Sequence, residues 1–145
     1  MRAGRPPAKA REAALARAFE LASRLIHARS HAHGLYPAQW SAIRYFRSAS
    51  GAHRTSISLA RYQGLAFGAV ARTVRTLILR GYLRKAGSAG RGRAEIIEVT
   101  PEGLAMLASD PVETIADAVS ALDGERKDAL AAALDTILRA LAERD

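Results

Sequence analysis

Residues 55–83 read TSISLARYQGLAFGAVARTVRTLILRGYL, and this stretch decides the fold. Thr55 and Ser56 are typical N-cap residues, because their side-chain oxygens accept hydrogen bonds from the free backbone N–H groups at the start of a helix. The short apolar run behind them ends at Gly64, which predicts a first helix of about two turns. The apolar pattern then resumes and continues to Gly81, the expected end of a second helix.

The second helix of this stretch has two different faces. Its apolar residues recur at helical spacing, and they are Ala66, Val70, Val74, Leu77 and Ile78. The opposite face carries Arg72, Thr73, Arg75 and Thr76. Two helices joined by a short turn with glycine, the second with arginine on its free face, form the plan of a helix-turn-helix that places its second helix in the DNA major groove. These residues alone are equally compatible with an ordinary helical hairpin.

Two strand-like segments and a basic connector follow the second helix. Residues 82–85 and 95–99 are predicted strands, and the connector at residues 86–94 is rich in Gly and Ser, with Arg91 and Arg93 as its only charges. A basic hairpin tip directly after a helix-turn-helix is typical of a wing that contacts phosphates or enters a minor groove. This connector favours the DNA-binding interpretation over the ordinary hairpin.

The order of these elements resembles the MarR (multiple antibiotic resistance regulator) family of winged-helix transcription factors. The resemblance rests on the glycine turn, the sequence LILRGYL at residues 77–83, the basic hairpin and the sequence VTPEG at residues 99–103. It covers most of the chain and is strongest from Pro37 to Leu107.

The resemblance implies a fold that is mainly α with a small two-stranded β-wing. We expect a disordered basic tail at residues 1–9 and a single MarR-like domain at residues 10–145. Within this domain, residues 37–103 would form a winged helix-turn-helix DNA-binding lobe. Residues 10–33 and 104–145 would form N- and C-terminal dimerisation helices that flank the lobe. Apolar residues recur at helical spacing in both terminal segments.

Two features depart from the pattern of that family. The wing of the family usually carries an Asp-x-Arg pair; its Arg corresponds here to Arg93, whereas its Asp position is Arg91. Without that carboxylate, we expect a wing that is more positive and less well braced. The recognition helix begins AFGAVA at residues 66–71, where the family mostly has polar residues. Phosphate contacts and DNA shape are therefore expected to provide more of the affinity than base contacts do.

The DNA-binding residues predicted from these features are Ser56, Phe67, Gly68, Ala69, Ala71, Arg72, Arg75, Arg91 and Arg93. The two arginines of the recognition helix can reach guanine edges, and Phe67 can touch a thymine methyl group. The small residues of the helix allow close approach to the groove. Ser56 would bind phosphate at a helix N-terminus, and the two wing arginines would bind phosphate beside the recognition helix.

Charge is divided unevenly along the chain. Residues 1–94 contain 18 Lys/Arg and 2 Asp/Glu, a net charge of +16, whereas residues 95–145 contain 4 and 12, a net charge of −8. The basic part contains the predicted helix-turn-helix and wing, which predicts double-stranded DNA as a partner. Neither terminal helix combines a basic face with an aromatic apolar one, so a membrane is not an expected partner. With neither a signal-peptide pattern nor a long apolar run, the expected location is cytoplasmic.

Aromatic residues around the start of the lobe indicate a ligand site. In the resembled family, the helix entry at Pro37 borders a cleft for phenolic or other aromatic ligands, and Tyr36, Trp40 and Tyr45 could line such a cleft. The alternative is that these residues, Trp40 above all, belong to the core.

Three histidines, His27, His31 and His33, lie at the end of the first predicted helix. The i, i+4 spacing of His27 and His31 can supply two ligands to zinc or nickel. The alternative is a polar helix end, where imidazolium interacts favourably with the C-terminal dipole. No metal site is expected, because no Cys, Asp or Glu lies nearby in the sequence to complete one.

The leading functional hypothesis is a sequence-specific transcriptional regulator. It would act as a homodimeric repressor on a pseudo-palindromic operator, with release by a small aromatic ligand. Two alternatives stay open: a sequence-tolerant architectural DNA-binding protein, and a ligand or metal sensor with an unidentified effector. An enzyme is not expected, because no nucleophile, base and orienting group can be assembled from adjacent stretches. No cofactor is expected either.

Overall fold

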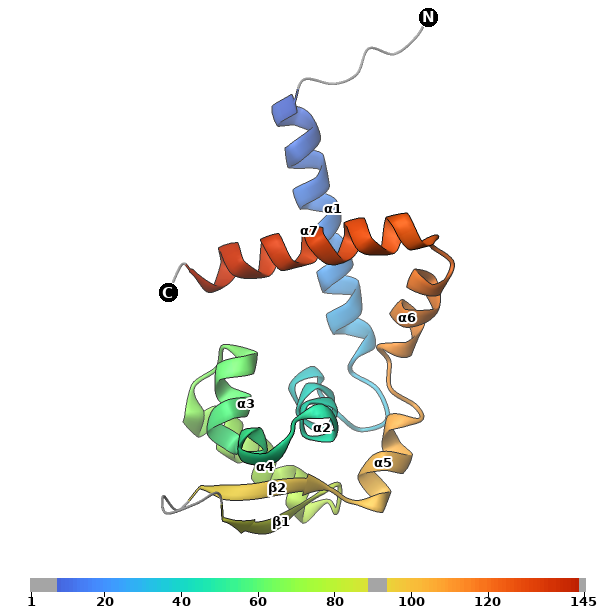
Figure 1. Cartoon of the computed structure of the whole chain (residues 1–145). Helices are drawn as coiled ribbons and strands as arrows, with labels where there is room; N and C mark the ends of the chain where they lie inside the picture. The colour runs from blue at the N-terminus through green and yellow to red at the C-terminus, as the bar shows by residue number, and fades with distance from the viewer. Residues whose placement is uncertain (1–7, 89–93, 144–145) are drawn as a thin grey trace, which may run out of the picture.

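The computed structural model describes residues 8–88 and 94–143, which form seven α-helices, a short 3-10 helix and a two-stranded antiparallel sheet (Figure 1). One end of the molecule is a winged lobe. Its elements are α2 (Pro37–Ser48), the 3-10 helix (Gly51–His53), α3 (Ser56–Gln63), α4 (Phe67–Leu79), β1 (Leu83–Ser88), β2 (Glu95–Val99) and α5 (Pro101–Leu107). This architecture confirms the predicted fold class.

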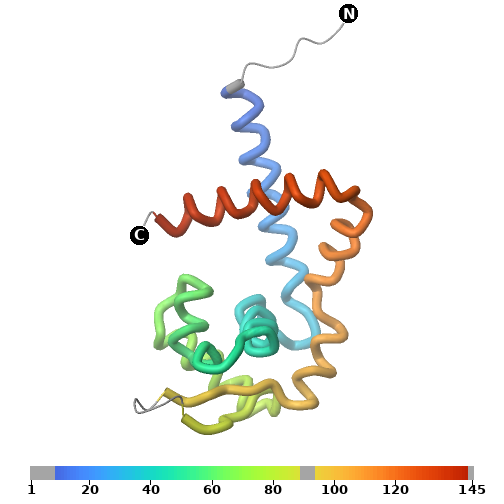
Figure 2. The backbone as a smooth tube through the Cα atoms, in the orientation of Figure 1, coloured from blue at the N-terminus to red at the C-terminus, as the bar shows by residue number. Residues whose placement is uncertain are grey.

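The three remaining helices extend away from the lobe and are called the helical arm here. They are α1 (Ala8–Arg29), α6 (Glu113–Ser120) and α7 (Gly124–Ala142). The backbone trace in Figure 2 shows that the arm joins the lobe at two places, between α1 and α2 and between α5 and α6. Among the described helices, none is both long enough and apolar enough to cross a membrane.

The helix-turn-helix forms where the sequence predicts it. The Thr55 hydroxyl accepts a hydrogen bond from the Ser58 amide at 3.3 Å, which caps α3. Gly64 ends that helix with φ of 63°, a left-handed conformation that costs glycine little. The chain then turns directly into α4, so that α3 and α4 pack on each other.

The core of the lobe lies between its helices and the sheet. Its largest fully buried side chains are Trp40, Phe46, Ile43, Leu59, Leu77, Leu83, Ile97 and Val70. They come from α2, α3, α4 and both strands, so the recognition helix and the wing are fixed to one packed unit. Burial of these apolar side chains is the main contribution that holds α4 in place.

The VTPEG segment joins the sheet to α5 through a very close backbone approach. The Thr100 hydroxyl accepts from the Gly103 amide at 3.1 Å, and the Thr100 amide donates to the Tyr82 carbonyl at 3.1 Å. A Cβ added at Gly103 would overlap the Tyr82 carbonyl oxygen and lie 2.7 Å from Val99 Cγ1. Position 103 therefore requires glycine, because there is no room for a side chain.

Two of the predicted boundaries differ from those of the structure. Residue 104 lies inside α5, and Leu107 of that helix is 5% exposed in the core of the lobe, so the lobe extends beyond residue 103. The expected tail at residues 1–9 lies outside the described residues except for Ala8 and Lys9, which belong to α1.

Apolar side chains remain uncovered on the helical arm. They include Leu15, Leu21 and Leu25 on α1 and Leu138 and Leu141 on α7, each more than half exposed. A single chain therefore leaves apolar stripes in water at both ends of its sequence.

Candidate DNA-binding interface

Helix α4 presents a basic, partly apolar face on the outer surface of the lobe. Val70, Val74 and Leu77 are buried and anchor one side of the helix. By helical periodicity, Gly68, Arg72 and Arg75 lie on the opposite side, and all three are exposed. The buried side thus determines which residues α4 offers to a partner.

The two arginines of α4, Arg72 and Arg75, are exposed cations on the surface of the lobe. None of the ion pairs within residues 8–88 and 94–143 includes Arg72 or Arg75. An exposed helix face with two unpaired guanidinium groups attracts a polyanion and can make bidentate contacts to guanine or to phosphate.

A hollow of about 400 Å³ lies between α4 and the base of the wing. It brings together four of the predicted residues, which are Ser56, Phe67, Ala71 and Arg75. Phe67 is 55% exposed at its edge, beside the first turn of α3. These four residues of α3 and α4 therefore share one hollow, whereas Gly68 and Arg72 lie outside it on the exposed face of α4.

Not every predicted residue belongs to this surface. Ala69 is half-buried, and its position two residues from Phe67 and from Ala71 places it on a different side of α4. The wing residues Arg91 and Arg93 lie outside the described residues.

The hollow also contains two charged residues that were not predicted, Lys85 and Glu95, whose side chains pair at 3.3 Å across the base of the wing. Strand alternation is the signal that could have identified Lys85, because it is two residues from the buried Leu83 and so lies on the same face of β1. The ion pair reduces the repulsion that Glu95 would otherwise exert on phosphate.

The three aromatic residues predicted for ligand binding do not share one site. Trp40 is 0% exposed and belongs to the core, which supports the alternative given above, whereas Tyr36 is 64% exposed. The Tyr45 hydroxyl donates to the His53 carbonyl at 2.8 Å, and its ring lies 5.1 Å from the ring of Tyr62.

A different hollow, of about 640 Å³, separates the C-terminal end of α7 from the lobe. Its lining comes from α1, α2, α3, the turn after α3, and α7, and consists of His27, Pro37, Ala38, Ser41, Tyr62, Gln63, Leu65, Leu138 and Ala142. Tyr62 is the aromatic residue here, and sequence reasoning missed it.

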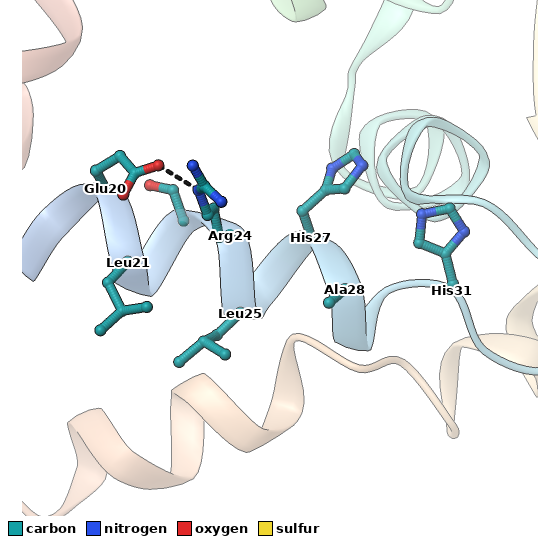
Figure 3. A pocket seen from close by; sticks show the side chains of 8 residues that line it. Glu20, Leu21, Arg24, Leu25, His27, Ala28 and His31 are labelled. Carbon is teal, nitrogen blue, oxygen red and sulfur yellow. Dashed lines mark hydrogen bonds and ion pairs between the residues drawn. The ribbon is translucent and has the colours of Figure 1, made fainter.

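His27 and His31, at and just beyond the end of α1, lie close to each other. Figure 3 shows His27 on α1 and His31 on the loop just beyond it, both directed to one side, with Leu21 and Leu25 directed to the other. The rings of His27 and His31 lie 5.3 Å apart, edge to face. Within the described part of the chain, no group of three or more His, Cys, Asp or Glu residues could hold a metal ion.

Sequence comparison finds no protein-family model that matches this chain and no match among curated proteins. Comparison of the structure with solved structures does find similar folds. The chain is similar to a MarR/EmrR family transcriptional regulator from Acinetobacter sp. ADP1, with a TM-score of 0.70 and 22% identity over 91% of this chain and 96% of that one.

Two further similar structures were solved with a bound partner. One is the MepR-DNA complex from S. aureus, with a TM-score of 0.67 and 17% identity over 86% of this chain and 96% of that one. The other is the PcaV transcriptional regulator from Streptomyces coelicolor in complex with its natural ligand, with a TM-score of 0.62 and 20% identity over 90% of each chain. This chain therefore has the winged-helix fold of the MarR family of transcriptional regulators.

Proposed function

We propose that this protein is a DNA-binding transcriptional regulator of the MarR type, without enzymatic activity. The observation that carries the proposal is the exposed face of α4 beside the base of a wing, where Arg72 and Arg75 take part in none of the ion pairs of the described residues. A rigid basic helix next to a β-hairpin fits a major groove and the flanking backbone. Repression, by occupation of an operator, is the output we propose.

The acting form would be a homodimer. The exposed leucines of α1 and α7 support this step, because a second copy can cover apolar surface that the single chain leaves in water. Two-fold symmetry would then place two α4 helices in successive major grooves, roughly 34 to 36 Å apart. The corresponding operator is an inverted repeat.

Selection of bound sequences from a random pool of duplex DNA, at two salt concentrations, tests the proposal. We expect enrichment of an inverted repeat with half-sites about one helical turn apart. Strong binding without an enriched motif, lost at the higher salt concentration, would contradict sequence-specific regulation and favour the architectural alternative.

Phe67 is proposed to read thymine through its methyl group. Replacing the contacted thymine by uracil removes only that methyl, and we expect affinity to fall about 4-fold, the equivalent of roughly 0.8 kcal/mol for one buried carbon. The Phe67→Ala variant should bind both DNAs equally well. Leu104→Ala is the control, because Leu104 is similarly exposed, at 48% against 55%, but lies on α5 and does not line the hollow, and this variant should keep the uracil effect. An unchanged uracil effect in Phe67→Ala would contradict the assignment.

Release by a small aromatic ligand is a second candidate function, favoured by the 640 Å³ hollow between the lobe and α7. A ligand that binds there can shift the population of lobe orientations and thereby weaken DNA binding. With salicylate as the probe, we expect Tyr62→Ala to abolish ligand-induced DNA release, because Tyr62 lines the hollow. Tyr36→Ala is the matched control, since Tyr36 is similarly exposed, at 64% against 68%, but does not line the hollow. Equal effects of the two variants would exclude this hollow as the site.

A further inference from the structure

The joint between α5 and α6 contains a buried carboxylate, that of Asp110. Asp110 is 6% exposed, and it is the one ionisable side chain among the buried residues of the described chain. Burial of a carboxylate is unfavourable unless the charge is paired and hydrogen-bonded. The contacts of Asp110 therefore indicate what this residue does.

Asp110 connects three parts of the chain. Its Oδ2 lies 2.9 Å from Nε of Arg44 on α2, the central helix of the lobe. Its Oδ1 accepts from the Val112 amide at 3.0 Å. Its backbone amide donates to the Leu107 carbonyl at the end of α5, and its carbonyl accepts from the Glu113 amide at the start of α6. Asp110 thus lies between the two helices, is hydrogen-bonded to the last residue of α5 and the first residue of α6, and links the joint to α2.

Few other contacts could fix the arm relative to the lobe. The extensive packing between elements lies within the lobe, among α2, α3, α4, α5 and the sheet. The C-terminal end of α7 is separated from the lobe by the 640 Å³ hollow. At the other joint, Arg80 of the lobe donates to the Gly34 carbonyl at 2.7 Å. The direction of α6 and α7 relative to the lobe consequently depends on the geometry at Asp110.

We propose that Arg44 and Asp110 are positioning residues that set the angle between the lobe and the helical arm. The inference rests on the proposed dimeric DNA-binding function. Because the arm would hold the two subunits together, this angle determines the distance between the two α4 helices of a dimer. The pair would thereby select the half-site spacing that the protein accepts, although neither residue lies on the DNA-binding surface.

The first test measures the lobe-to-lobe distance without DNA. The chain contains no cysteine, so Ala52→Cys, at an exposed position of the 3-10 helix, introduces a single site for a spin label in each subunit. Pulsed electron resonance on the labelled dimer should give a narrow distance distribution. We expect Asp110→Asn to broaden or shift it, because this change removes the charge that attracts Arg44 while an amide oxygen can still accept from the Val112 amide.

The second test measures affinity for operators whose half-site separation is changed by one or two base pairs. We expect the unmodified protein to prefer one spacing by about 10-fold, and Asp110→Asn to lose most of that preference while binding a single half-site normally. A double variant, Arg44→Gln with Asp110→Asn, leaves no buried charge unpaired and keeps the test valid where the single variant folds poorly. It should show the same loss.

Glu98→Gln is the matched control, because Glu98 forms an ion pair with Arg84 at 2.7 Å inside the wing hairpin and not between lobe and arm. Its distance distribution and spacing preference should equal those of the unmodified protein. Folded, dimeric Asp110 variants with an unchanged distance distribution and spacing preference would overturn the inference. If the unmodified protein prefers no inverted repeat at all, the proposed function fails, whereas the distance measurement still decides whether Asp110 orients the lobes.

Discussion

Replacing Gly103 by alanine is expected to destabilise the protein by about 3 kcal/mol and to lower its melting temperature by roughly 10 °C. The added methyl group would overlap the Tyr82 carbonyl oxygen and press on the Val99 side chain. The first of these is backbone, which cannot move aside as a flexible side chain could, so the sheet and α5 must separate. Thermal unfolding followed by circular dichroism measures the effect.

Gly124→Ala is the control for this prediction. Gly124 begins α7, and a Cβ at that position would meet no heavy atom within 4 Å. Alanine is favoured over glycine in helices by roughly 0.5 to 1 kcal/mol, so the melting temperature should stay the same or rise slightly. A Gly103→Ala protein as stable as the Gly124→Ala protein would show that the junction between β2 and α5 is looser than the structure indicates.

The second large effect is expected on DNA binding. Arg72→Ala should lower affinity for the selected operator by about 10- to 100-fold, because a bidentate contact between arginine and guanine contributes about 1–3 kcal/mol of discrimination. Affinity for random DNA should change far less, and discrimination should relax at one base position of the half-site. Fluorescence anisotropy with operator and scrambled duplexes at fixed salt concentration measures both quantities.

Two further variants separate base contacts from charge. Arg139→Ala removes the same charge from α7, a helix of the arm and not of the lobe that contains α4 (Figure 1). Arg139 pairs there with Asp135, and its loss should leave both affinities unchanged. Arg93→Ala, in the wing, should weaken binding to operator and to random DNA alike and flatten the salt dependence. Equal losses on the two DNAs for Arg72→Ala and Arg93→Ala would contradict the proposed division between base and phosphate contacts.

The helix-turn-helix was predictable because its signals are local. The Thr55 cap, the Gly64 stop and the apolar spacing of α4 each act within a few residues, and the structure confirms them. The wing strands were placed nearly correctly for the same reason, although β1 continues to Ser88, beyond the predicted residue 85.

Contacts between distant segments were not predictable in this way. The pairing of Arg44 with Asp110 depends on how α5 folds back against α2, which no sequence period encodes. Trp40 was left open between the core and a ligand cleft for a related reason, because helical spacing places a residue on a face but does not say whether that face meets the core or a hollow. The structure buries it. Tyr62, on the exposed side of α3, became a candidate only once the end of α7 was located opposite it.

The uncovered leucines on α1 and α7 would make the folding and activity of this protein depend on its concentration in the cell. Where a second copy covers those stripes, assembly and folding are linked by mass action, so the folded fraction rises with the amount of chain present. Operator occupancy would then increase more steeply than in proportion to protein level, because only paired chains engage both half-sites. A regulator of this design would respond to its own abundance with a threshold, set by the leucine surface rather than by the DNA-reading helix.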